Sequence, residues 1–126
     1  LSGAYFISLH LPGGEENRNA GGAKEFEMRK NSAILLNVAR GEVVDENALD
    51  AALKAGELRY AVLDVQSQEP PKEDYPLYKN EKVILTPHMA SNTEECMGRM
   101  ALHAAMQIHK VLSGGQPDWP VNHPKF

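Results

Sequence analysis

AILLNVARG (residues 33–41), YAVLDV (60–65) and VILTPH (83–88) are three apolar runs, each of which leads into a polar or charged side chain. Their length, their β-branched content and the turn residues around them predict strands. Because the apolar residues are nearly continuous, we expect both faces of these strands to be buried, which is typical of a parallel sheet. The three runs therefore predict an α/β fold.

A helix is predicted over residues 46–55, between the first two of these strands. Asp45 can accept a hydrogen bond from the first turn of this helix, and Gly56 suits the left-handed position at which a helix ends. Upstream, residues 5–11 predict a further buried strand, and residues 23–29 have the composition of a helix. The resulting alternation of strands and helices indicates a parallel sheet covered by helices.

The last predicted helix follows Ser91, which together with Glu94 fits a capping box. Apolar residues recur at three- and four-residue spacing from Met97 onward, so we expect a buried stripe along this helix. Three prolines predict that residues 116–126 form an extended tail. We therefore divide the chain into residues 1–115, a single domain that includes the long final helix, and the C-terminal tail.

The charge and cysteine content of the chain narrow the classes of function. A net charge of −4 and the lack of a lysine and arginine cluster argue against nucleic acid and anionic membranes as partners. No apolar run approaches the roughly 18 residues of a membrane-spanning helix. Cys96 is the only cysteine, so no internal disulfide can form and a cytoplasmic location is expected. No spacing of histidine, cysteine and acidic residues indicates a metal site.

Arg40, Asp64, Glu69 and His88 follow the carboxyl ends of predicted strands. In a parallel sheet these ends lie at one edge, which is where ligands of open α/β sheets bind. An arginine binds a carboxylate through two parallel hydrogen bonds, and a carboxylate beside a histidine favours the protonated imidazole. Together these residues predict a hydride-transfer site for an anionic substrate. Taken singly, each has a structural alternative, because Arg40 could be a surface residue and Asp64 could cap a loop.

The order of these motifs resembles that of the D-isomer-specific 2-hydroxyacid dehydrogenases, a family that includes phosphoglycerate dehydrogenase and glyoxylate/hydroxypyruvate reductase. The similarity rests on NVARGEVVDE at residues 37–46, LDVQSQEP at residues 63–70 and TPH at residues 86–88. It also covers SLHLP at residues 8–12. The resemblance implies the C-terminal half of a doubly wound, Rossmann-type parallel sheet with covering helices, so residues 1–115 would be part of an NAD-binding domain.

The resemblance also implies roles for the residues at the sheet edge. Arg40 would hold the carboxylate and carbonyl groups of a small 2-oxo or 2-hydroxy acid. His88 would be the general acid and base that exchanges a proton with the substrate oxygen, and Glu69 would be the carboxylate paired with it. We therefore predict Arg40, Glu69 and His88 as the catalytic residues.

NAD is the cofactor that the resemblance implies, with NADP as the alternative. Asp64 would lie beside the nicotinamide carboxamide, and four residues would line the cofactor: Leu11, Pro12, Val38 and Ala39. The resemblance implies a homodimer as well, because the cofactor-binding domains of this family pair across a two-fold axis.

The largest departure from the family is a missing glycine motif. The family binds the cofactor pyrophosphate with G-x-G-x-x-G at the start of a helix, and the glycine pairs at residues 13–14, 21–22 and 114–115 do not fit this pattern. The matching region would precede Leu1, so we expect a fragment of an NAD(P)-dependent oxidoreductase that is inactive by itself. Two alternatives are an NAD(H)-binding regulatory protein of the corepressor kind on the same scaffold and an inactive stand-alone half-domain.

Overall fold

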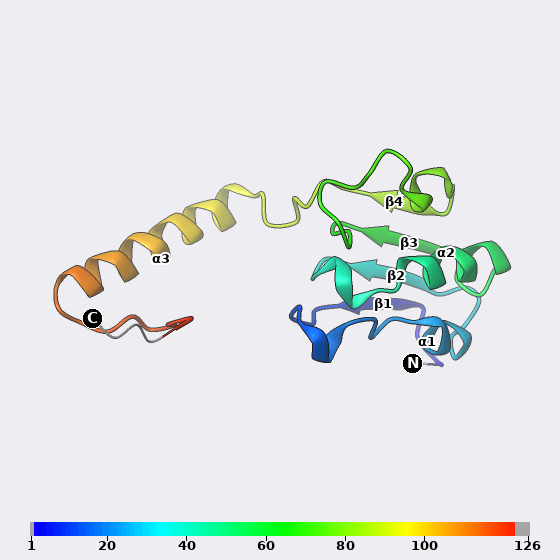
Figure 1. Ribbon diagram of the computed structural model, residues 1–126, viewed down its shortest axis with the longest axis horizontal. Coiled ribbons are helices and arrows are strands. Elements are labelled where there is room, and N and C mark those ends of the chain that lie inside the picture. The colour runs from blue at the N-terminus through cyan, green and yellow to red at the C-terminus, as the bar shows by residue number, and fades with distance from the viewer. Residues whose placement is uncertain (1, 123–126) are drawn as a thin grey trace. The chain divides into compact units, whose positions relative to one another are not determined.

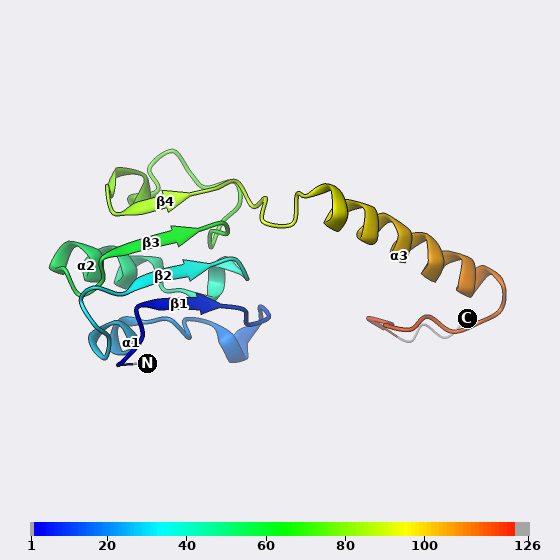
Figure 2. The ribbon, with the colours of Figure 1, turned by 180° about the vertical axis from the view of Figure 1, so that it is seen from behind.

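Four parallel strands lie side by side in the order β1-β2-β3-β4 in this computed structural model, which describes residues 2–122 (Figures 1 and 2). The strands are β1 (Phe6–Leu9), β2 (Ile34–Asn37), β3 (Tyr60–Leu63) and β4 (Val83–Leu85). Leu9 pairs with Asn37, Asn37 with Leu63, and Leu63 with Leu85. All four strands therefore end at the same edge, and the predicted parallel sheet is confirmed.

Two helices connect the strands of this sheet. α2 (Glu46–Ala55) has the predicted bounds, because the Asp45 side chain accepts two N–H groups of its first turn and Gly56 ends it with φ of 77°. α1 (Ala23–Glu27) is shorter than the predicted span of residues 23–29. Three short 3-10 helices complete the connections: η1 (Glu15–Asn17), η2 (Gly41–Val43) and η3 (Pro76–Lys79).

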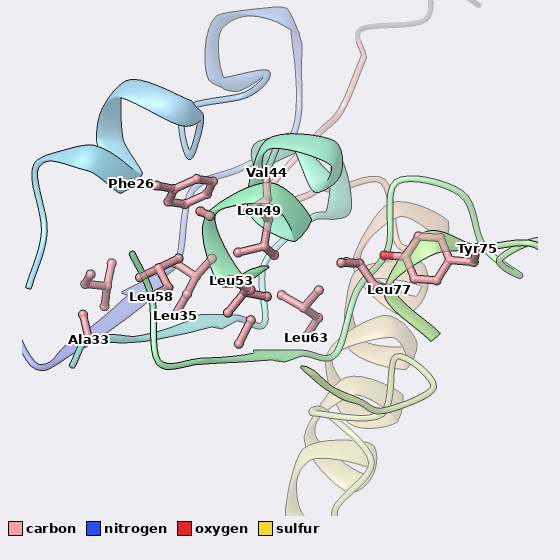
Figure 3. Close-up of a cluster of buried hydrophobic side chains, with 13 residues drawn as sticks. Phe26, Ala33, Leu35, Val44, Leu49, Leu53, Leu58, Leu63, Tyr75 and Leu77 are labelled. Atoms are coloured by element: carbon pink, nitrogen blue, oxygen red, sulfur yellow. The ribbon is translucent and has the colours of Figure 1, made fainter. Parts of the chain in front are cut away.

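One face of the sheet carries the hydrophobic core. α1 and α2 both lie on this face, in front of the strands in Figure 1 and behind them in Figure 2. Leu35 and Leu63 from the strands are buried in one cluster with Leu49 and Leu53 of α2 and with Phe26 of α1 (Figure 3). Full burial of a leucine stabilises the fold by roughly 1.5–3 kcal/mol, so this single layer of contacts holds the strands in register.

Within residues 2–90, no helix covers the opposite face of the sheet. Phe6 is 70% exposed, Tyr60 41% and Ile84 57%. The prediction that the strands are buried on both faces is therefore wrong for the described residues. The reason is that α1 and α2 cover the same face, which the apolar pattern of the strands does not specify.

Residues 91–126 form a second unit. Its helix α3 (Glu94–Leu112) begins directly after Thr93, whose hydroxyl oxygen accepts a backbone N–H of the first turn at 3.1 Å. The predicted capping box of Ser91 and Glu94 is therefore wrong, because Thr93 is the residue that adjoins the helix and caps it.

The apolar stripe of α3 is exposed. No side chain of this helix is buried among the described residues, and Met97 and Met100 are both exposed. Within the described part of its own unit the stripe is therefore not buried as predicted, since helical spacing specifies an apolar face but not a partner for that face. No helix within residues 2–122 is long and apolar enough to span a membrane.

The C-terminal tail contacts α3 within the second unit. The Asp118 carboxylate accepts a hydrogen bond from the side chain of Gln107 at 2.8 Å, and the Trp119 ring stacks on the His103 ring at a centroid distance of 5.8 Å. Residues 123–126 of the predicted tail lie outside the described residues. The division of the chain immediately before the tail stays a prediction.

Candidate active site

The segments that follow β2, β3 and β4 form a pocket at the carboxyl edge of the sheet. Its volume is about 260 Å³, and all three segments contribute to its lining: Arg40, Gly41, Glu42, Val65, Gln66, Ser67, Glu69 and His88. We call it the Arg40–His88 pocket. The structure therefore brings together the three residues predicted to be catalytic, at the edge where parallel α/β sheets bind their ligands.

His88 and Glu69 form a hydrogen-bonded pair in this pocket. Nδ1 of His88 lies 2.7 Å from Oε2 of Glu69, and Oε1 of Glu69 accepts the N–H of Gln66 at 3.0 Å. Burial opposes ionisation of Glu69, but the hydrogen bonds from His88 and Gln66 hold its pKa below the ordinary value. Glu69 is therefore a carboxylate at neutral pH and can accept a hydrogen bond from Nδ1 of His88. The contact through Nδ1 leaves Nε2, the opposite ring nitrogen, for a ligand.

Asp64 holds the backbone from which His88 projects. Its carboxylate accepts the hydroxyl of Thr86 at 2.5 Å and the N–H groups of Met89 and Ala90 at 2.9 and 2.7 Å. Burial opposes ionisation of Asp64, but these three hydrogen bonds hold its pKa below the ordinary value. The His88 N–H in turn donates to the carbonyl of Asp64 at 2.8 Å. These contacts keep His88 at φ of 50°, a left-handed conformation that few residues other than glycine adopt.

Asp64 does not line the pocket that contains the other three residues. Its side chain is only 4% exposed, and both of its oxygens accept hydrogen bonds from residues 86–90. The contact with nicotinamide that we predict for Asp64 stays a prediction. The sequence placed Asp64 correctly at the end of a strand, but the donors that surround it come from a segment more than 20 residues away.

Asn37, the last residue of β2, shapes the turn that carries Arg40. Its side-chain oxygen accepts the N–H of Ala39 at 3.1 Å, and its side-chain nitrogen donates to the carbonyl of Arg40 at 2.9 Å. Arg40 itself is exposed, so its guanidinium can present N–H donors to a ligand. We did not predict a role for Asn37, although a polar side chain that ends an apolar strand is the signal that marks it.

Gly41 brings the arginine turn against the segment that carries Glu69. A Cβ atom at Gly41 would overlap the carbonyl group of Gln66 and the amide nitrogen of Ser67. No side chain fits there, so the backbone of Gly41 lies in direct contact with the peptide that joins these two residues. This contact fixes the width of the pocket between Arg40 and Glu69.

Glu42 is a pocket residue that the sequence analysis did not single out. Its Oε1 accepts the N–H of Gly14 at 2.6 Å, and its Oε2 lies 3.7 Å from the Arg18 guanidinium. Glu42 therefore joins the pocket to the loop that follows β1. Its position two residues after Arg40 is the only sequence signal that could have pointed to it.

A cleft of about 390 Å³ lies where the segments after β1 and β2 meet. Four of the five residues predicted to contact the cofactor line it, and Asp64 does not. The full lining is His10, Leu11, Pro12, Gly13, Val38, Ala39 and Arg40. Leu11 and Val38 are 39% and 38% exposed, which provides apolar surface for a flat ring. The role of Leu11, Pro12, Val38 and Ala39 in lining the cofactor stays a prediction. Arg40 lines both this cleft and the Arg40–His88 pocket.

The family described as D-isomer specific 2-hydroxyacid dehydrogenase, NAD binding domain, matches residues 1–90 of the chain. The chain belongs to this family. The resemblance found in the sequence motifs is therefore confirmed, and so is the prediction of a Rossmann-type, NAD-binding fold.

Relatives of this dehydrogenase domain include both sequences and crystal structures. D-3-phosphoglycerate dehydrogenase of Methanocaldococcus jannaschii is 44% identical over 123 residues, which are 98% of this chain and 23% of the relative. D-lactate dehydrogenase with NAD+ from Lactobacillus jensenii has a TM-score of 0.85 and 32% identity, covering 98% of this chain and 41% of that structure. A D-isomer specific 2-hydroxyacid dehydrogenase from Xanthobacter autotrophicus Py2, in complex with NADPH and MES, has a TM-score of 0.82 and 34% identity, covering 97% of this chain and 50% of that structure.

This 2-hydroxyacid dehydrogenase domain is shorter than the proteins it matches. It spans 23% of the archaeal phosphoglycerate dehydrogenase and 41% of the lactate dehydrogenase. The family match therefore includes the carboxyl edge of the sheet, with its pocket and cleft. The activity of the complete protein is proposed below.

Proposed function

We propose that the complete protein is an NAD(P)-dependent oxidoreductase that transfers a hydride between the nicotinamide cofactor and a D-2-hydroxy acid or its 2-oxo acid. The observation that carries this proposal is the Arg40–His88 pocket, in which Arg40 and the His88–Glu69 pair line one space. Arg40 also borders the cleft that fits the nicotinamide ring. The residues proposed to bind the carboxylate, to donate the proton and to line the cofactor are therefore neighbours.

Arg40 would bind and orient the substrate. Its planar guanidinium can form two parallel hydrogen bonds with a carboxylate, which a 2-oxo acid carries next to its carbonyl group. Because Arg40 borders both the pocket and the cleft, a substrate bound to it would have its carbonyl carbon close to both. A bound nicotinamide cofactor would supply the hydride to this carbon in reduction and accept it in oxidation.

His88 would exchange the proton. In reduction, Nε2 of the protonated ring donates its proton to the carbonyl oxygen of the substrate, and in oxidation the neutral ring removes it. Glu69 lies 2.7 Å from Nδ1 and would hold the ring in this orientation. General acid and base catalysis of this kind contributes about 10²–10⁴-fold to a rate. Asp64 would act on this step by holding the backbone of His88.

We further propose that the 126-residue chain does not turn over substrate by itself. The sequence contains no G-x-G-x-x-G motif for the pyrophosphate of the cofactor. Residues 1–115 would then supply the nicotinamide end of the site and the proton-transfer residues. Oxidation of NADH at an ordinary enzymatic rate by the purified 126-residue chain would contradict this proposal.

The test of the function is a reductase assay on the complete gene product. NADH and NADPH are each supplied with a panel of 2-oxo acids that includes glyoxylate, hydroxypyruvate and pyruvate. His88→Gln should lower kcat by about 10²–10⁴-fold and leave the Kd for NADH within about twofold. His109→Gln is the matched control, because His109 is an exposed residue of α3.

A complete protein that binds NADH but reduces none of these acids would overturn the proposal and favour the regulatory alternative. Equal kcat values for the wild type and His88→Gln would overturn the role of His88 alone. The two outcomes are separable because cofactor binding is measured independently of turnover.

We also infer that the complete protein is a cytoplasmic homodimer. Support for the location is that Cys96 is the only cysteine of the sequence, which is typical of proteins in reducing compartments. Support for the dimer is the membership in a family whose cofactor-binding domains pair across a two-fold axis. Light scattering of the complete protein should give twice the mass of one chain, and a monomeric mass at micromolar concentration would contradict the dimer.

A further inference from the structure

Glu46, the first residue of α2, lies outside the Arg40–His88 pocket and carries an unusual set of contacts. Its Oε1 accepts the N–H of Ser67 and the hydroxyl of Tyr75, each at 2.8 Å. Its Oε2 accepts the Ser67 hydroxyl at 2.5 Å. One carboxylate at the start of α2 therefore binds three donors from the segment that follows β3.

Ser67 connects Glu46 to the proton-transfer pair. The peptide between Gln66 and Ser67 lies against the backbone of Gly41, and the N–H of Gln66 donates to Glu69 at 3.0 Å. Glu69 in turn contacts His88. The segment from Gln66 to Glu69 is therefore held between Gly41 on one side and Glu46 on the other.

Tyr75 gives Glu46 a rigid partner. The Tyr75 ring belongs to the buried hydrophobic cluster (Figure 3) and packs edge-to-face on Tyr78 with 5.2 Å between ring centroids. Burial, followed by the hydrogen bond to Glu46, raises the pKa of Tyr75 far above its ordinary value, so its hydroxyl stays a donor. The position of the Glu46 carboxylate is thus fixed from the core as well as from α2.

Apart from the contacts of Glu46 and the Glu69–His88 pair, the segment has few polar restraints. The side chain of Gln66 donates to the carbonyl of Thr86 at 3.4 Å, which is long for a hydrogen bond. No strand or α-helix is assigned between β3 and β4 in this described part of the chain, where η3 is the only helical turn. Glu46 is therefore the residue outside the segment that accepts both the N–H and the hydroxyl of Ser67.

We propose that Glu46 is a positioning residue for the proton-transfer pair, which holds Ser67 so that Glu69 reaches His88 across the pocket from Arg40. This inference rests on the proposed function, since it gives Glu46 a part in the same site. A carboxylate that is misplaced by about 1 Å would lower turnover by up to about 10²-fold, because proton transfer depends steeply on geometry.

The test compares three variants with the wild type in the complete gene product. Glu46→Ala removes every acceptor for the donors of Ser67 and Tyr75. Glu46→Gln keeps the oxygen that accepts the Ser67 N–H and the Tyr75 hydroxyl, and its amide group can donate to the Ser67 hydroxyl, which also accepts. Asn47→Ala is the matched control, because Asn47 is the next residue of α2 and is exposed.

Two measurements distinguish positioning from a purely structural role. Glu46→Ala should lower kcat by roughly ten- to a hundredfold with KM for the 2-oxo acid within about twofold, while Glu46→Gln restores most of kcat. A side-chain ¹³C titration by NMR should show the pKa of Glu69 rising toward its ordinary value in Glu46→Ala but staying low in Glu46→Gln. Asn47→Ala should match the wild type in both measurements.

The inference is overturned if Glu46→Ala keeps the wild-type kcat and the low pKa of Glu69. It is also overturned if Glu46→Gln fails as badly as Glu46→Ala, because charge and not position would then be the cause. Should Glu46→Ala fail to fold, Ser67→Ala removes one of the same contacts, and an unchanged kcat in that variant counts against the inference. The NMR titration needs no turnover, so it tests the position of Glu69 even if the proposed dehydrogenase activity is absent.

Discussion

Replacing Gly41 with alanine tests how closely the arginine turn and the proton-transfer segment are packed. The added Cβ would overlap backbone atoms of Gln66 and Ser67 and not the end of a flexible side chain. Backbone atoms cannot rotate out of the way, so one of the two segments has to move. The movement would widen the pocket between Arg40 and the His88–Glu69 pair.

The size of the effect follows from the contact distance that a carbon atom requires. A carbon atom needs roughly 3.5 Å from a non-bonded heavy atom, so the peptide after Gln66 has to move by about 1 Å or more. Overpacking of this kind lowers the free energy of unfolding by about 1–3 kcal/mol. In a protein of 150 residues or more, each 1 kcal/mol lowers Tm by about 2–4 °C, so Tm should fall by about 2 °C or more. A displacement of about 1 Å between Arg40 and Glu69 should also lower kcat about 10²-fold.

Thermal unfolding and steady-state kinetics of the complete protein measure both effects. Gly98→Ala is the control, because a Cβ at Gly98 in α3 meets no heavy atom within 4 Å apart from the adjacent residues and the backbone of its own helix. Its alanine should stabilise the helix by up to about 1 kcal/mol and leave kcat unchanged. If Gly41→Ala has the Tm and kcat of the wild type, the direct contact between Gly41 and the Gln66–Ser67 peptide is refuted.

Other predictions concern Arg40 and Asp64. Arg40→Lys should lower kcat/KM for 2-oxo acids about ten- to a hundredfold, because lysine cannot form two parallel hydrogen bonds and a charged hydrogen bond contributes about 1.5–3 kcal/mol. Steady-state kinetics measures this loss, and Arg59→Lys, at an exposed arginine, is the control. Asp64→Asn should lower the free energy of unfolding by about 1–3 kcal/mol, measured in urea, because an amide nitrogen cannot accept the N–H of Ala90. The folded pKa values of Asp64 and Glu69 are lowered, so their contribution to stability is complete above the pKa of the unfolded chain and is lost as the pH falls through the folded values. Urea unfolding below about pH 5 should show this loss of stability. In Asp64→Asn the free energy of unfolding should depend less on pH than in the wild type. An identical pH dependence would contradict the role of the Asp64 hydrogen bonds.

The location of the candidate site could be predicted from the sequence because parallel strands share one edge. Arg40, Asp64 and His88 each follow a strand, and the register of β2, β3 and β4 aligns the ends of those strands. Once the three strands were predicted, the parallel arrangement alone placed Arg40, Asp64 and His88 at the carboxyl edge of the sheet. The same reasoning applied to α2, whose ends are marked by local contacts of Asp45 and Gly56.

The covering of the apolar faces could not be predicted in the same way. Phe6, Tyr60 and Ile84 are as apolar as their buried neighbours on the same strands, yet they are exposed. Met97 and Met100 have helical spacing on α3 and are exposed too. An apolar pattern shows which face of an element avoids water, but the partner of that face is decided by the arrangement of other elements.

Asp64 and Glu46, which hold the site together, each accept hydrogen bonds from backbone N–H groups of a segment far away in the sequence. The sequence alone does not show these contacts. Asp64 accepts the N–H groups of Met89 and Ala90, and Glu46 accepts that of Ser67, 21 residues away. These donors become neighbours only once the strands have paired. Removing the Asp64 carboxylate leaves partly buried N–H groups without acceptors, at about 1–3 kcal/mol for each, so that variant should lower Tm and kcat together. Arg40 is exposed, and its loss should lower kcat/KM with little change in Tm, which separates residues that act on the substrate from those that position them.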